Sequence, residues 1–376
     1  MLDSIKIKIG IAGCGKVAEL HAKAIENLKD ASLDAVWSRT SETAQKFAKK
    51  HHTKAFEFIE PMVGDKNLDF VIICTPHPFH VQPAIEAANA GANVLVEKPL
   101  ASTIKDVKLI IDACERNRVK LGVISQRRWY EPVKRLRQAV EDGKTGKPIL
   151  GTVSMLGWRD KAYYDSDAWR GTWEMEGGGV LVNQAPHQLD LLLWLMGEID
   201  EVYGTWANLN HPYIEVEDTA LAIIKFKNGG LGNVILSNSM KPGIHGKVHI
   251  HGDLASAGVQ TEGGAMFIAG STGIQEAPYN DLWTIPGEEH KMDKWKQQDK
   301  KEFFSSDPTI RYLEYQIQDF VQAIRNEHKP AVTGYDGLRV VELITAIYRS
   351  QRDNAPIKFP VKPEVDHNDM DGRSSH

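Results

Sequence analysis

The sequence predicts an α/β protein in which an N-terminal, doubly wound parallel sheet is followed by an α/β domain with a large, mostly antiparallel open sheet. Residues 5–126 alternate short apolar runs with amphipathic stretches, as a parallel sheet with crossover helices requires. A glycine-rich turn directly follows the first apolar run. Beyond residue 150, runs that alternate apolar and polar residues predict antiparallel strands.

The first half of the chain supplies the parallel sheet and its crossover helices. The predicted strands are Ile5–Ala12, Leu33–Ser38, Phe70–Cys74, Val94–Glu97 and Leu121–Ser125, and the predicted helices are Val17–Leu28, Glu42–His51, His80–Ala90 and Ile104–Arg118. We expect Ser41 to cap the second helix and Gly91 to end the third. Because such a sheet binds ligands beyond the carboxyl ends of its strands, functional residues should follow each strand directly.

The second half supplies the antiparallel sheet. Its predicted strands are Leu150–Leu156, Glu201–Ala207, Thr219–Phe226, Leu231–Ser239 and Lys247–His251. Residues 253–310 lack clear periodicity and should form an excursion in which the lysine-rich run Lys291–Glu302 is a solvated loop. Helices are expected at 311–327 and 336–351. We therefore divide the chain into a first domain at 1–128, a second domain at 129–360 and a polar, mobile tail at 361–376.

Composition limits the function classes. The chain has 376 residues, 42% of them hydrophobic, which suffices for two domains with buried cores. A net charge of -5 without a long basic stretch argues against nucleic-acid binding. Cys14, Cys74 and Cys114 are far apart, so we expect no metal site and a reducing compartment. The N-terminus lacks a signal-peptide core, and no apolar run approaches the roughly 18 residues of a membrane helix, so a soluble, cytoplasmic protein is expected.

The turn after the first strand has the pattern G-x-G-x-x-A. It consists of Gly13, Cys14, Gly15, Lys16, Val17 and Ala18. Gly13 permits a tight turn, Gly15 lets backbone approach a pyrophosphate, and the following helix presents N–H groups to the phosphates. We therefore expect Gly13, Gly15, Lys16 and Val17 to bind a dinucleotide in a Rossmann domain. The alternative is a tight turn without a ligand.

The residues after the second strand concern the choice of cofactor. An NAD enzyme usually has an acidic residue there, whereas this chain has Ser38, Arg39 and Thr40. Arg39 is suited to a 2′-phosphate, with the two hydroxyl groups as further donors. NADP is therefore favoured, and NAD remains open because Arg39 could instead stack on the adenine ring.

Further polar residues follow the later strands. Thr75, Pro76 and His80 should lie near the ribose and nicotinamide, although His80 could equally begin a helix without a role. Glu97 and Lys98 follow the next strand, and we assign both to cofactor binding. In a cleft between the domains, Lys98 would stabilise charge developing on a substrate oxygen, whereas the alternative is a solvated loop lysine. Gln126, after the last strand, is a further cofactor candidate.

A second candidate site lies between three glycines and an apolar helix. Pro186 suits the first turn of a helix, so Asn183 should lie at its mouth and His187 about one turn further. The glycines at 177–179 let backbone approach a ligand, and the leucines at 191–195 anchor the helix. This arrangement predicts a proton-transfer site. The alternative is a helix start that packs its histidine.

Aromatic and arginine residues around this segment indicate a sugar site. The candidates for substrate binding are Arg128, Trp158, Arg159, Tyr164, Trp169, Arg170 and Asn183. Aromatic faces stack on pyranose rings, and guanidinium groups bind sugar oxygens or a negative substituent. An anionic sugar and a neutral glycoside both fit this set. The alternative is an aromatic-rich edge of the core.

These motifs together resemble the family of glucose–fructose oxidoreductase, inositol dehydrogenase and rhizopine-catabolism proteins (Gfo/Idh/MocA). The resemblance runs from about Ile5 to Pro360. It rests on the glycine turn, Thr75-Pro76-x-x-x-His80, Glu97-Lys98-Pro99 and Asn183-x-x-x-His187-x-x-Asp190. It implies a Rossmann domain joined to a C-terminal domain whose open sheet forms homodimers or homotetramers, and a Lys98–Pro99 bond that is cis in many members.

The resemblance also implies roles at the site. The catalytic lysine of the family falls on Lys98 and its proton-transferring histidine on His187. This chain has Asn183 where many members have Asp, so we expect Asn183 to position substrate hydroxyls and His187 to carry the proton alone. Some members resembling sugar-nucleotide dehydrogenases also have Asn there. Asp190 would either orient His187 or be a surface acid.

The sequence thus predicts an NAD(P)-dependent oxidoreductase that transfers a hydride between nicotinamide and a secondary hydroxyl of a sugar, glycoside or sugar nucleotide. Lys98 and His187 should face each other across the nicotinamide. Two alternatives share the fold. One is a redox-neutral, NAD-dependent glycosidase, and the other is a non-catalytic sensor of a sugar or cofactor.

Overall fold

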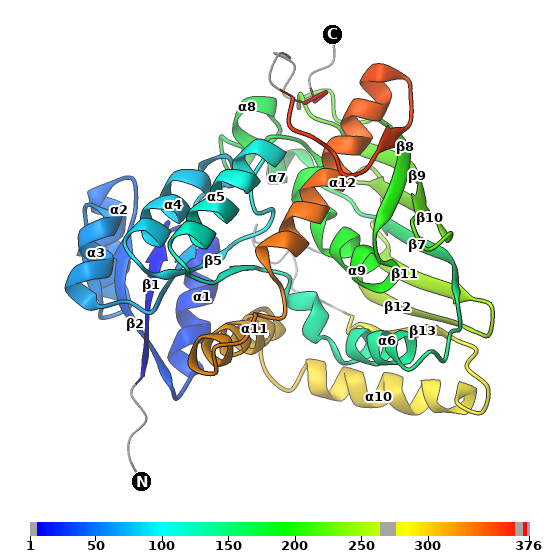
Figure 1. Cartoon of the computed structure of the whole chain (residues 1–376), viewed down its shortest axis with the longest axis horizontal. Coiled ribbons are helices and arrows are strands. Elements are labelled where there is room, and N and C mark those ends of the chain that lie inside the picture. The colour runs from blue at the N-terminus through cyan, green and yellow to red at the C-terminus, as the bar shows by residue number, and fades with distance from the viewer. Residues whose placement is uncertain (1–5, 264–275, 365–370, 374–376) are drawn as a thin grey trace. The chain divides into compact units, whose positions relative to one another are not determined.

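The computed structural model describes residues 6–263, 276–364 and 371–373, which belong to two compact units (Figure 1). The first unit comprises Met1–Gln126 and Pro308–Leu338, and the second comprises Arg127–Asp307 and Arg339–His376. The first unit thus includes residues 308–338, which the sequence analysis assigns to the second domain. Residues 1–5 of the predicted first strand, residues 264–275 of the predicted excursion, and residues 365–370 and 374–376 of the predicted tail lie outside the described residues.

The first unit contains a six-stranded parallel sheet with the order β3-β2-β1-β4-β5-β6. The strands are β1 (Ile7–Ala12), β2 (Ala31–Trp37), β3 (Lys54–Phe56), β4 (Phe70–Ile73), β5 (Asn93–Val96) and β6 (Leu121–Val123). The helices are α1 (Lys16–Asn27), α2 (Ser41–Lys50), α3 (Ile59–Lys66), α4 (Val81–Asn89), α5 (Ile104–Arg116) and α11 (Pro308–Arg325), with a short 3₁₀ turn at His77–Phe79. The predicted doubly wound parallel sheet is confirmed, and its winding reverses between β1 and β4.

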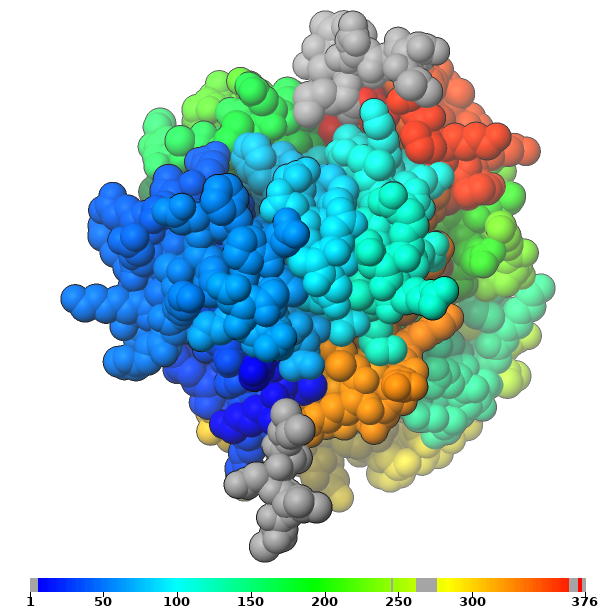
Figure 2. Space-filling view, turned by 60° about the vertical axis from the view of Figure 1, so that its left-hand side comes forward, coloured from blue at the N-terminus to red at the C-terminus, as the bar shows by residue number. Residues whose placement is uncertain are grey.

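The core of this unit explains why α11 belongs to it. The isoleucines of β1 are buried, and α11 contributes Leu313, Ile317, Phe320 and Val321, which lie on one face at helical spacing. The ring of Phe320 packs edge-on against Phe70 of β4, with the centroids 5.0 Å apart. In Figure 2 the orange surface of α11 adjoins the blue N-terminal residues. The last part of the unit therefore packs against its first helix and strand.

The second unit contains an eight-stranded sheet with the order β13-β12-β11-β7-β10-β9-β8-β14. Its strands are β7 (Pro148–Leu156), β8 (Ile199–Ala207), β9 (Thr219–Phe226), β10 (Leu231–Ser237), β11 (His245–Gly252), β12 (Ser256–Gly263), β13 (Tyr279–Trp283) and β14 (Ile357–Lys358). Only the β7–β10 pair among these strands is parallel, so the predicted mostly antiparallel sheet is confirmed for the described residues.

Helices cover one face of this sheet (Figure 1). The helices of the unit are α6 (Glu131–Glu141), α7 (Lys161–Asp165), α8 (Trp173–Glu176), α9 (Pro186–Met196), α10 (Met292–Phe303) and α12 (Gly334–Asp353), the last of which begins in the first unit. Of these, α6, α9 and α10 contact strands of the sheet. Gly151 of β7 lies so close to α9 that a Cβ there would be 2.6 Å from Met196. Within the described parts of the chain, no helix is long and apolar enough to cross a membrane.

Three predictions about individual elements are wrong. The run Lys291–Glu302 is not a solvated loop, because most of it forms α10, where Trp295 packs on Trp283 at 5.1 Å and Asp299 pairs with Arg135 at 2.9 Å. The lysines of α10 obscure the helical spacing of Trp295, Asp299 and Phe303, which face the protein. The cap of α2 is Thr40 rather than Ser41, which is the first helical residue. The predicted excursion over residues 253–310 is also wrong, because β12 and β13 extend the second sheet there. A three-residue strand, β3, and a helix with an internal proline and glycine, α3, were not predicted.

Candidate active site

The glycine turn after β1 is built by close packing of strand ends. Gly13 has a φ of +100°, and a Cβ on it would lie 2.6 Å from the backbone nitrogen of Thr75. The N–H of Gly13 donates to the carbonyl of Trp37 at the end of β2 over 2.7 Å. Only glycine fits this position, because both the conformation and the space exclude a side chain.

Gly15 is different, because the protein leaves space beside it. It caps the N-terminus of α1 without a side-chain hydrogen bond, and a Cβ on it would meet no protein atom within 4 Å. Lys16, which is exposed, and Val17 begin the helix. The space beside Gly15 therefore lies at the positive end of the helix dipole, as binding of a dinucleotide pyrophosphate requires. The residues of the turn fit that group.

The residues after β2 lie at the surface. The guanidinium of Arg39 lies 5.9 Å from the ring centroid of Phe79, which follows β4. Arg39 and Thr40 are exposed and Ser38 is half-buried. The hydroxyl of Thr40 contacts that of Thr43 at 2.7 Å, which holds the start of α2. A flat cation beside an aromatic ring suits an adenine ring and a phosphate on its ribose equally.

His80 links two loops of the first unit. It is fully buried, with Nε2 2.8 Å from the carbonyl of Thr75 and Nδ1 3.0 Å from that of Pro99. Burial lowers the pKa of the His80 ring against the effect of these carbonyls. Thr75 in turn donates its hydroxyl to the carbonyl of Phe79 over 2.9 Å, and Pro76 is exposed. Both ring nitrogens of His80 contact backbone carbonyl oxygens. His80 therefore influences a ligand through the position of the two loops that it joins.

The segment after β5 carries Lys98 and a cis Lys98–Pro99 bond, as the family resemblance implies. Glu97 contacts Nε2 of His21 in α1 at 2.7 Å and accepts the N–H of Lys98 over 3.1 Å. Burial raises the pKa of Glu97, but the hydrogen bond and charge of His21 and the charge of Lys98 outweigh it, so the net pKa is lowered. The carboxylate therefore anchors this loop to α1. Lys98 itself is half-buried, as is Gln126 beyond β6.

The proposed proton-transfer segment begins with a turn of π-helix at Val180–Gln184, followed by α9. The carboxylate of Glu217 accepts the N–H groups of Gly179 over 2.9 Å and of Leu181 over 3.0 Å. A Cβ on Gly179 would collide with the backbone carbonyl of Glu217. Burial raises the pKa of Glu217 to about 7. This carboxylate is therefore the N-terminal cap that the segment lacks in its own sequence.

Asn183 and His187 lie on this segment, as the position of Pro186 predicts. Asn183 is half-buried, and its Nδ2 donates to the hydroxyl of Tyr163 over 3.0 Å and to the carboxylate of Glu176. His187 is in the first turn of α9 and is 8% exposed. The structure thus places both residues at one helix start. It also adds Glu176, which was not predicted, and Tyr163, which belongs to the aromatic set expected at the sugar site.

Arg128 and Asp190 form a buried ion pair. The guanidinium donates from Nε to Oδ2 over 2.8 Å and from Nη2 to Oδ1 over 2.5 Å. Asp190 is 5% exposed, so the alternative of a surface acid is wrong. Arg128 is also 5% exposed and lies 4.8 Å from the ring centroid of Trp194. The charge of Arg128 is therefore compensated by Asp190 inside the protein. A substrate-binding role for Arg128 stays a prediction.

The predicted sugar-binding side chains fall into two groups. Trp158 and Tyr164 each lie 5.5 Å from the ring of His211, and Lys241 lies 5.2 Å from the Trp158 ring. In the other group, Arg170 lies 4.3 Å from the ring centroids of both Trp169 and Tyr163. Arg159 is buried, with Nη1 donating to the carbonyl of Trp158 over 2.8 Å. Trp158 and Trp169 are half-buried and therefore retain accessible ring surface.

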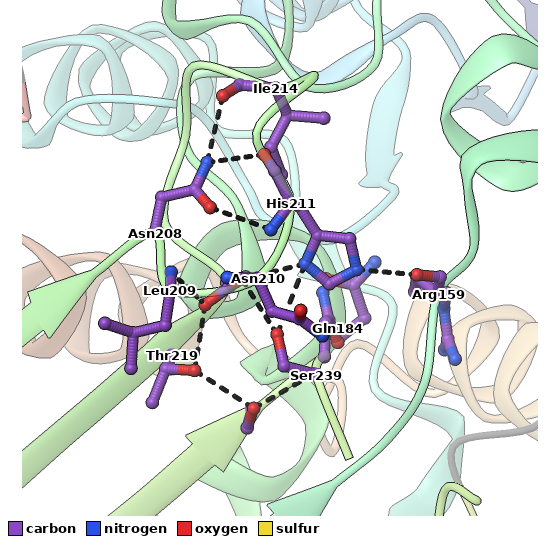
Figure 3. Close-up of polar contacts among 12 residues, drawn as sticks. Arg159, Gln184, Asn208, Leu209, Asn210, His211, Ile214, Thr219 and Ser239 are labelled. Atoms are coloured by element: carbon purple, nitrogen blue, oxygen red, sulfur yellow. Dashed lines mark hydrogen bonds and ion pairs between the residues drawn. The ribbon is translucent and has the colours of Figure 1, made fainter. Parts of the chain in front are cut away.

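His211, which the sequence analysis missed, is the centre of a polar cluster shown in Figure 3. Its Nδ1 lies 2.8 Å from a carboxylate oxygen of Asp218 and its Nε2 2.7 Å from the carbonyl of Arg159. Burial lowers the pKa of His211, but the bonds to Asp218 and Arg159 outweigh it and raise the net value, whereas that of Asp218 is well below its usual range. The His211–Asp218 pair therefore supports the loop that carries Trp158.

The cluster also contains Ser239, so it has the residue types of a nucleophilic triad. Its geometry excludes that chemistry, because Ser239, 3.2 Å from Nδ1 of His211, approaches the same ring nitrogen as Asp218 and donates its hydroxyl to that carboxylate over 2.8 Å. Both nitrogens of His211 already face other acceptors. The cluster is therefore structural. Across the described residues, no group of three or more His, Cys, Asp or Glu side chains could hold a metal ion.

Comparison with known proteins agrees with both units. Residues 7–125 match the oxidoreductase family with an NAD-binding Rossmann fold, and residues 133–258 match the Gfo/Idh/MocA C-terminal domain. Myo-inositol 2-dehydrogenase of Thermotoga maritima is 26% identical over 358 residues, covering 94% of this chain and 98% of its own. The NAD(+)-dependent scyllo-inositol 2-dehydrogenase of Bacillus subtilis is 25% identical, with 95% and 97% covered.

A solved structure extends the comparison to three dimensions. The WlbA dehydrogenase of Bordetella pertussis, in complex with NADH and UDP-GlcNAcA, superimposes with a TM-score of 0.79 at 29% identity, covering 95% of this chain and 100% of that one. The glycine turn at the end of β1, the Rossmann sheet and the mostly antiparallel second sheet lead to the same conclusion. The chain belongs to the Gfo/Idh/MocA family of NAD(P)-dependent oxidoreductases.

Proposed function

We propose that the protein transfers a hydride between NAD(P) and a secondary hydroxyl of a sugar, glycoside or sugar nucleotide. The observation that carries this proposal is the placement of Asn183 in the π-helical turn and of His187 in the first turn of α9, four residues further along the chain. The open turn at Gly15 supports binding of the dinucleotide. The inositol dehydrogenases and the UDP-GlcNAcA complex among the relatives show that polyhydroxylated rings suit this family.

Each predicted catalytic residue has one role in this proposal. The bound nicotinamide supplies the hydride acceptor or donor. His187 takes the proton of the reacting hydroxyl, and the Lys98 ammonium stabilises the negative charge that develops on that oxygen. Asn183 positions a hydroxyl of the substrate. His187 acts without a carboxylate at position 183, since the residue there is an amide.

For the cofactor, we propose NADP in preference to NAD. Arg39, at the end of β2 and over the Phe79 ring, supports recognition of a 2′-phosphate. The NADH bound to the WlbA relative supports the opposite choice. Replacing Arg39 with Ala distinguishes the two cofactor choices. If Arg39 binds the 2′-phosphate, the variant should lose affinity for NADP and keep its affinity for NAD.

For the substrate, we propose stacking on the accessible faces of Trp158 and Trp169, with Arg170 as a donor to ring oxygens or an anionic substituent. Tyr164 and Arg159 support these residues from buried positions. A panel of sugars, glycosides, cyclitols and sugar nucleotides, including uronic forms, would identify the class.

We further propose that the protein is a homodimer or homotetramer that uses the open face of the eight-stranded sheet. The exposed apolar side chains on that face are Tyr203, Leu221, Ile223, Leu231 and Ile235. Tyr203 is paired with Ile223, and Ile235 with Leu221, so they form one patch across three strands. Light scattering should give a dimer or larger, and Ile223→Glu should yield monomers. A wild-type monomer would contradict this proposal.

The decisive experiment measures absorbance of the reduced cofactor with NAD and NADP in parallel across the substrate panel. Lys98→Ala and His187→Ala should each lower turnover by about 10²-fold or more while cofactor binding, measured by fluorescence, is retained. Lys105→Ala and His290→Ala, which change exposed residues, are the controls. Turnover that survives both changes would mean that the roles are wrong.

The same assay distinguishes two other functions. Release of free sugar without accumulation of reduced cofactor would identify a redox-neutral glycosidase. Binding of sugar and cofactor without any turnover would identify a sensor. Either result would replace the proposed oxidoreductase activity.

A further inference from the structure

A histidine lies on the otherwise apolar buried face of α1, the helix that begins at the glycine turn. His21 is fully buried, and the other buried residues of this helix are Ala18, Ala22, Ala24 and Ile25. Nε2 of His21 lies 2.7 Å from Oε1 of Glu97, a residue 76 positions further along the chain. Because burial of an imidazole without a hydrogen bond is costly, the contact with Glu97 is what makes a histidine acceptable on this face.

The charge of Glu97 determines which nitrogen of the His21 ring carries a hydrogen. Burial raises the pKa of Glu97, but the hydrogen bond and charge of His21 and the charge of Lys98 outweigh it and lower the net value. An ionised carboxylate can only accept hydrogen bonds, so Nε2 of His21 is protonated and donates to Oε1. Within the described part of the chain, Nδ1 of His21 has no hydrogen-bond partner. The polar contact of this ring is therefore directed at Glu97.

The charge of Glu97 is also felt by His80 and Cys74, which are uncharged at neutral pH. Burial lowers the pKa of His80, and burial raises the pKa of Cys74. Lys98, in contrast, carries a charge that stabilises the ionised form of Glu97. The carboxylate is therefore engaged by the imidazole of α1 on one side and by its own loop on the other.

Lys98 lies between two residues that buried histidines hold in place. Oε2 of Glu97 accepts the N–H of Lys98 over 3.1 Å, while Oε1 of the same carboxylate accepts Nε2 of His21. On the other side of Lys98, the carbonyl of Pro99 lies 3.0 Å from Nδ1 of His80. The backbone from which the Lys98 side chain extends therefore cannot shift without breaking one of these contacts.

We propose that His21 is a positioning residue for the Lys98 ammonium: it orients the Glu97 carboxylate, which in turn fixes the backbone of Lys98. This rests on the proposed function, in which Lys98 stabilises charge on the reacting oxygen, and deepens it. It means that a residue of the dinucleotide-binding helix acts on the chemical step. A displacement of about 1 Å in a group that stabilises the transition state can cost about 10²-fold in rate.

The test compares two substitutions of His21. His21→Leu keeps the buried face of α1 apolar but removes the donor to Glu97. It should lower kcat by about 10-fold or more, while the Kd for the dinucleotide, measured by fluorescence, and the KM for the substrate stay unchanged. His21→Gln keeps an N–H donor at about the reach of Nε2, so it should restore most of the lost kcat.

Ile25→Ala is the matched control for structural damage. Ile25 is on the same helix, is 1% exposed and belongs to the apolar core of the first unit. Its truncation should lower the melting temperature at least as much as His21→Leu does, because it leaves a cavity. It should not lower the kcat of the folded protein, since Glu97 keeps its donor.

A double variant tests whether His21 acts through Glu97. Glu97→Gln should itself lower kcat, because the amide does not carry the charge that holds both N–H donors. If His21 acts through this carboxylate, His21→Leu with Glu97→Gln should lose no more kcat than Glu97→Gln alone. Thermal melting of each variant shows that it is folded at the temperature of the assay.

The outcomes distinguish this inference from the proposed function. If the wild type turns over a substrate and His21→Leu keeps its kcat, or loses no more than Ile25→Ala, the role of His21 is refuted while the function stands. The same conclusion follows if the losses of the double variant multiply, or if dinucleotide affinity falls in parallel with kcat. If the wild type turns over no member of the substrate panel, the proposed function is wrong and the role of His21 is wrong with it.

Discussion

Arg128 and Asp190 are joined by two hydrogen bonds within the second unit, at 2.8 Å and 2.5 Å, and neither side chain is more than 7% exposed. Asp190 follows His187 by one turn of α9. The ion pair therefore fixes the helix that carries the proposed proton acceptor. In a buried pair, removal of one partner leaves the other charge without compensation, which costs far more than loss of an exposed pair.

The first prediction concerns this pair. Asp190→Asn should lower the free energy of unfolding by about 3–5 kcal/mol, because the Arg128 guanidinium stays buried without its carboxylate. Urea unfolding measures the change. Glu198→Gln, which removes an exposed carboxylate 2.7 Å from Lys227, is the matched control and should have no measurable effect. Equal stability of the two variants would show that the buried pair does not hold α9.

The second prediction separates the two glycines of the cofactor turn. Gly15→Ala should leave the melting temperature unchanged, because a Cβ there meets no protein atom within 4 Å. It should still raise the KM for the dinucleotide by about 10-fold or more, since a methyl group would occupy the space that the pyrophosphate needs.

Gly13→Ala should weaken both properties. A Cβ there would lie 2.6 Å from the backbone of Thr75, in a conformation that only glycine adopts easily. Gly64→Ala, in α3 and with no protein atom within 4 Å of the added carbon, is the control for the substitution itself. If Gly15→Ala bound the cofactor normally, the phosphates would have to bind elsewhere.

The third prediction follows from the His211–Asp218 pair. The raised pKa of His211 stabilises the fold fully below its ordinary value of 6.5, and this contribution is lost as the pH rises through the folded-state pKa. The lowered pKa of Asp218 stabilises the fold above its ordinary value of 3.8 and is lost only on strong acidification. The pair therefore contributes most between about pH 4 and pH 6.5.

His211→Gln should accordingly cost about 3 kcal/mol of unfolding free energy at pH 6 and less at pH 9, where the native ring is closer to neutral. The measurement is urea unfolding at both values, with the exposed His290→Gln as control. A loss that is the same at both pH values would show that the ring is neutral throughout. Loosening of the Trp158 loop should also raise the KM for the substrate.

The sequence predicts the parts of this molecule that depend on local patterns. The Rossmann sheet follows from short apolar runs and a glycine turn, and the start of α9 follows from Pro186. In contrast, nothing in the lysine-rich composition of α10 shows that Trp295, Asp299 and Phe303 face one side of a helix until the partners Trp283 and Arg135 are known. The helical spacing of these three residues is present in the sequence, but the charged residues between them obscure it.

The supports of the candidate site could not be predicted for a different reason. Glu217 lies 38 residues from Gly179, the N–H of which it accepts, and His211 lies 52 residues from the Arg159 carbonyl. No local spacing encodes such contacts. The sequence does contain one indication of these supports, the adjacent acids Glu217 and Asp218 at the start of an apolar strand. Acidic side chains at such a position are buried unless they point to solvent.

The last prediction concerns Arg373, in a segment that the sequence analysis describes as a mobile tail. Its side chain is 1% exposed and lies 5.3 Å from the ring centroid of Tyr348, while the neighbouring Asp371 pairs with Arg349 at 2.7 Å. The charge of Arg373 acts on Glu217, the carboxylate that caps the turn before α9.

Arg373→Ala should therefore affect the candidate site as well as the fold. We expect a loss of about 3–5 kcal/mol in unfolding free energy, because Glu217 would be left as a buried acid without this cation. Turnover should fall as well, since a Glu217 that takes up a proton releases the N–H groups of Gly179 and Leu181. Lys358→Ala, an exposed cation nearby in sequence, is the control. If Arg373→Ala had the same free energy of unfolding as the control and retained full turnover, Arg373 would not stabilise the start of α9.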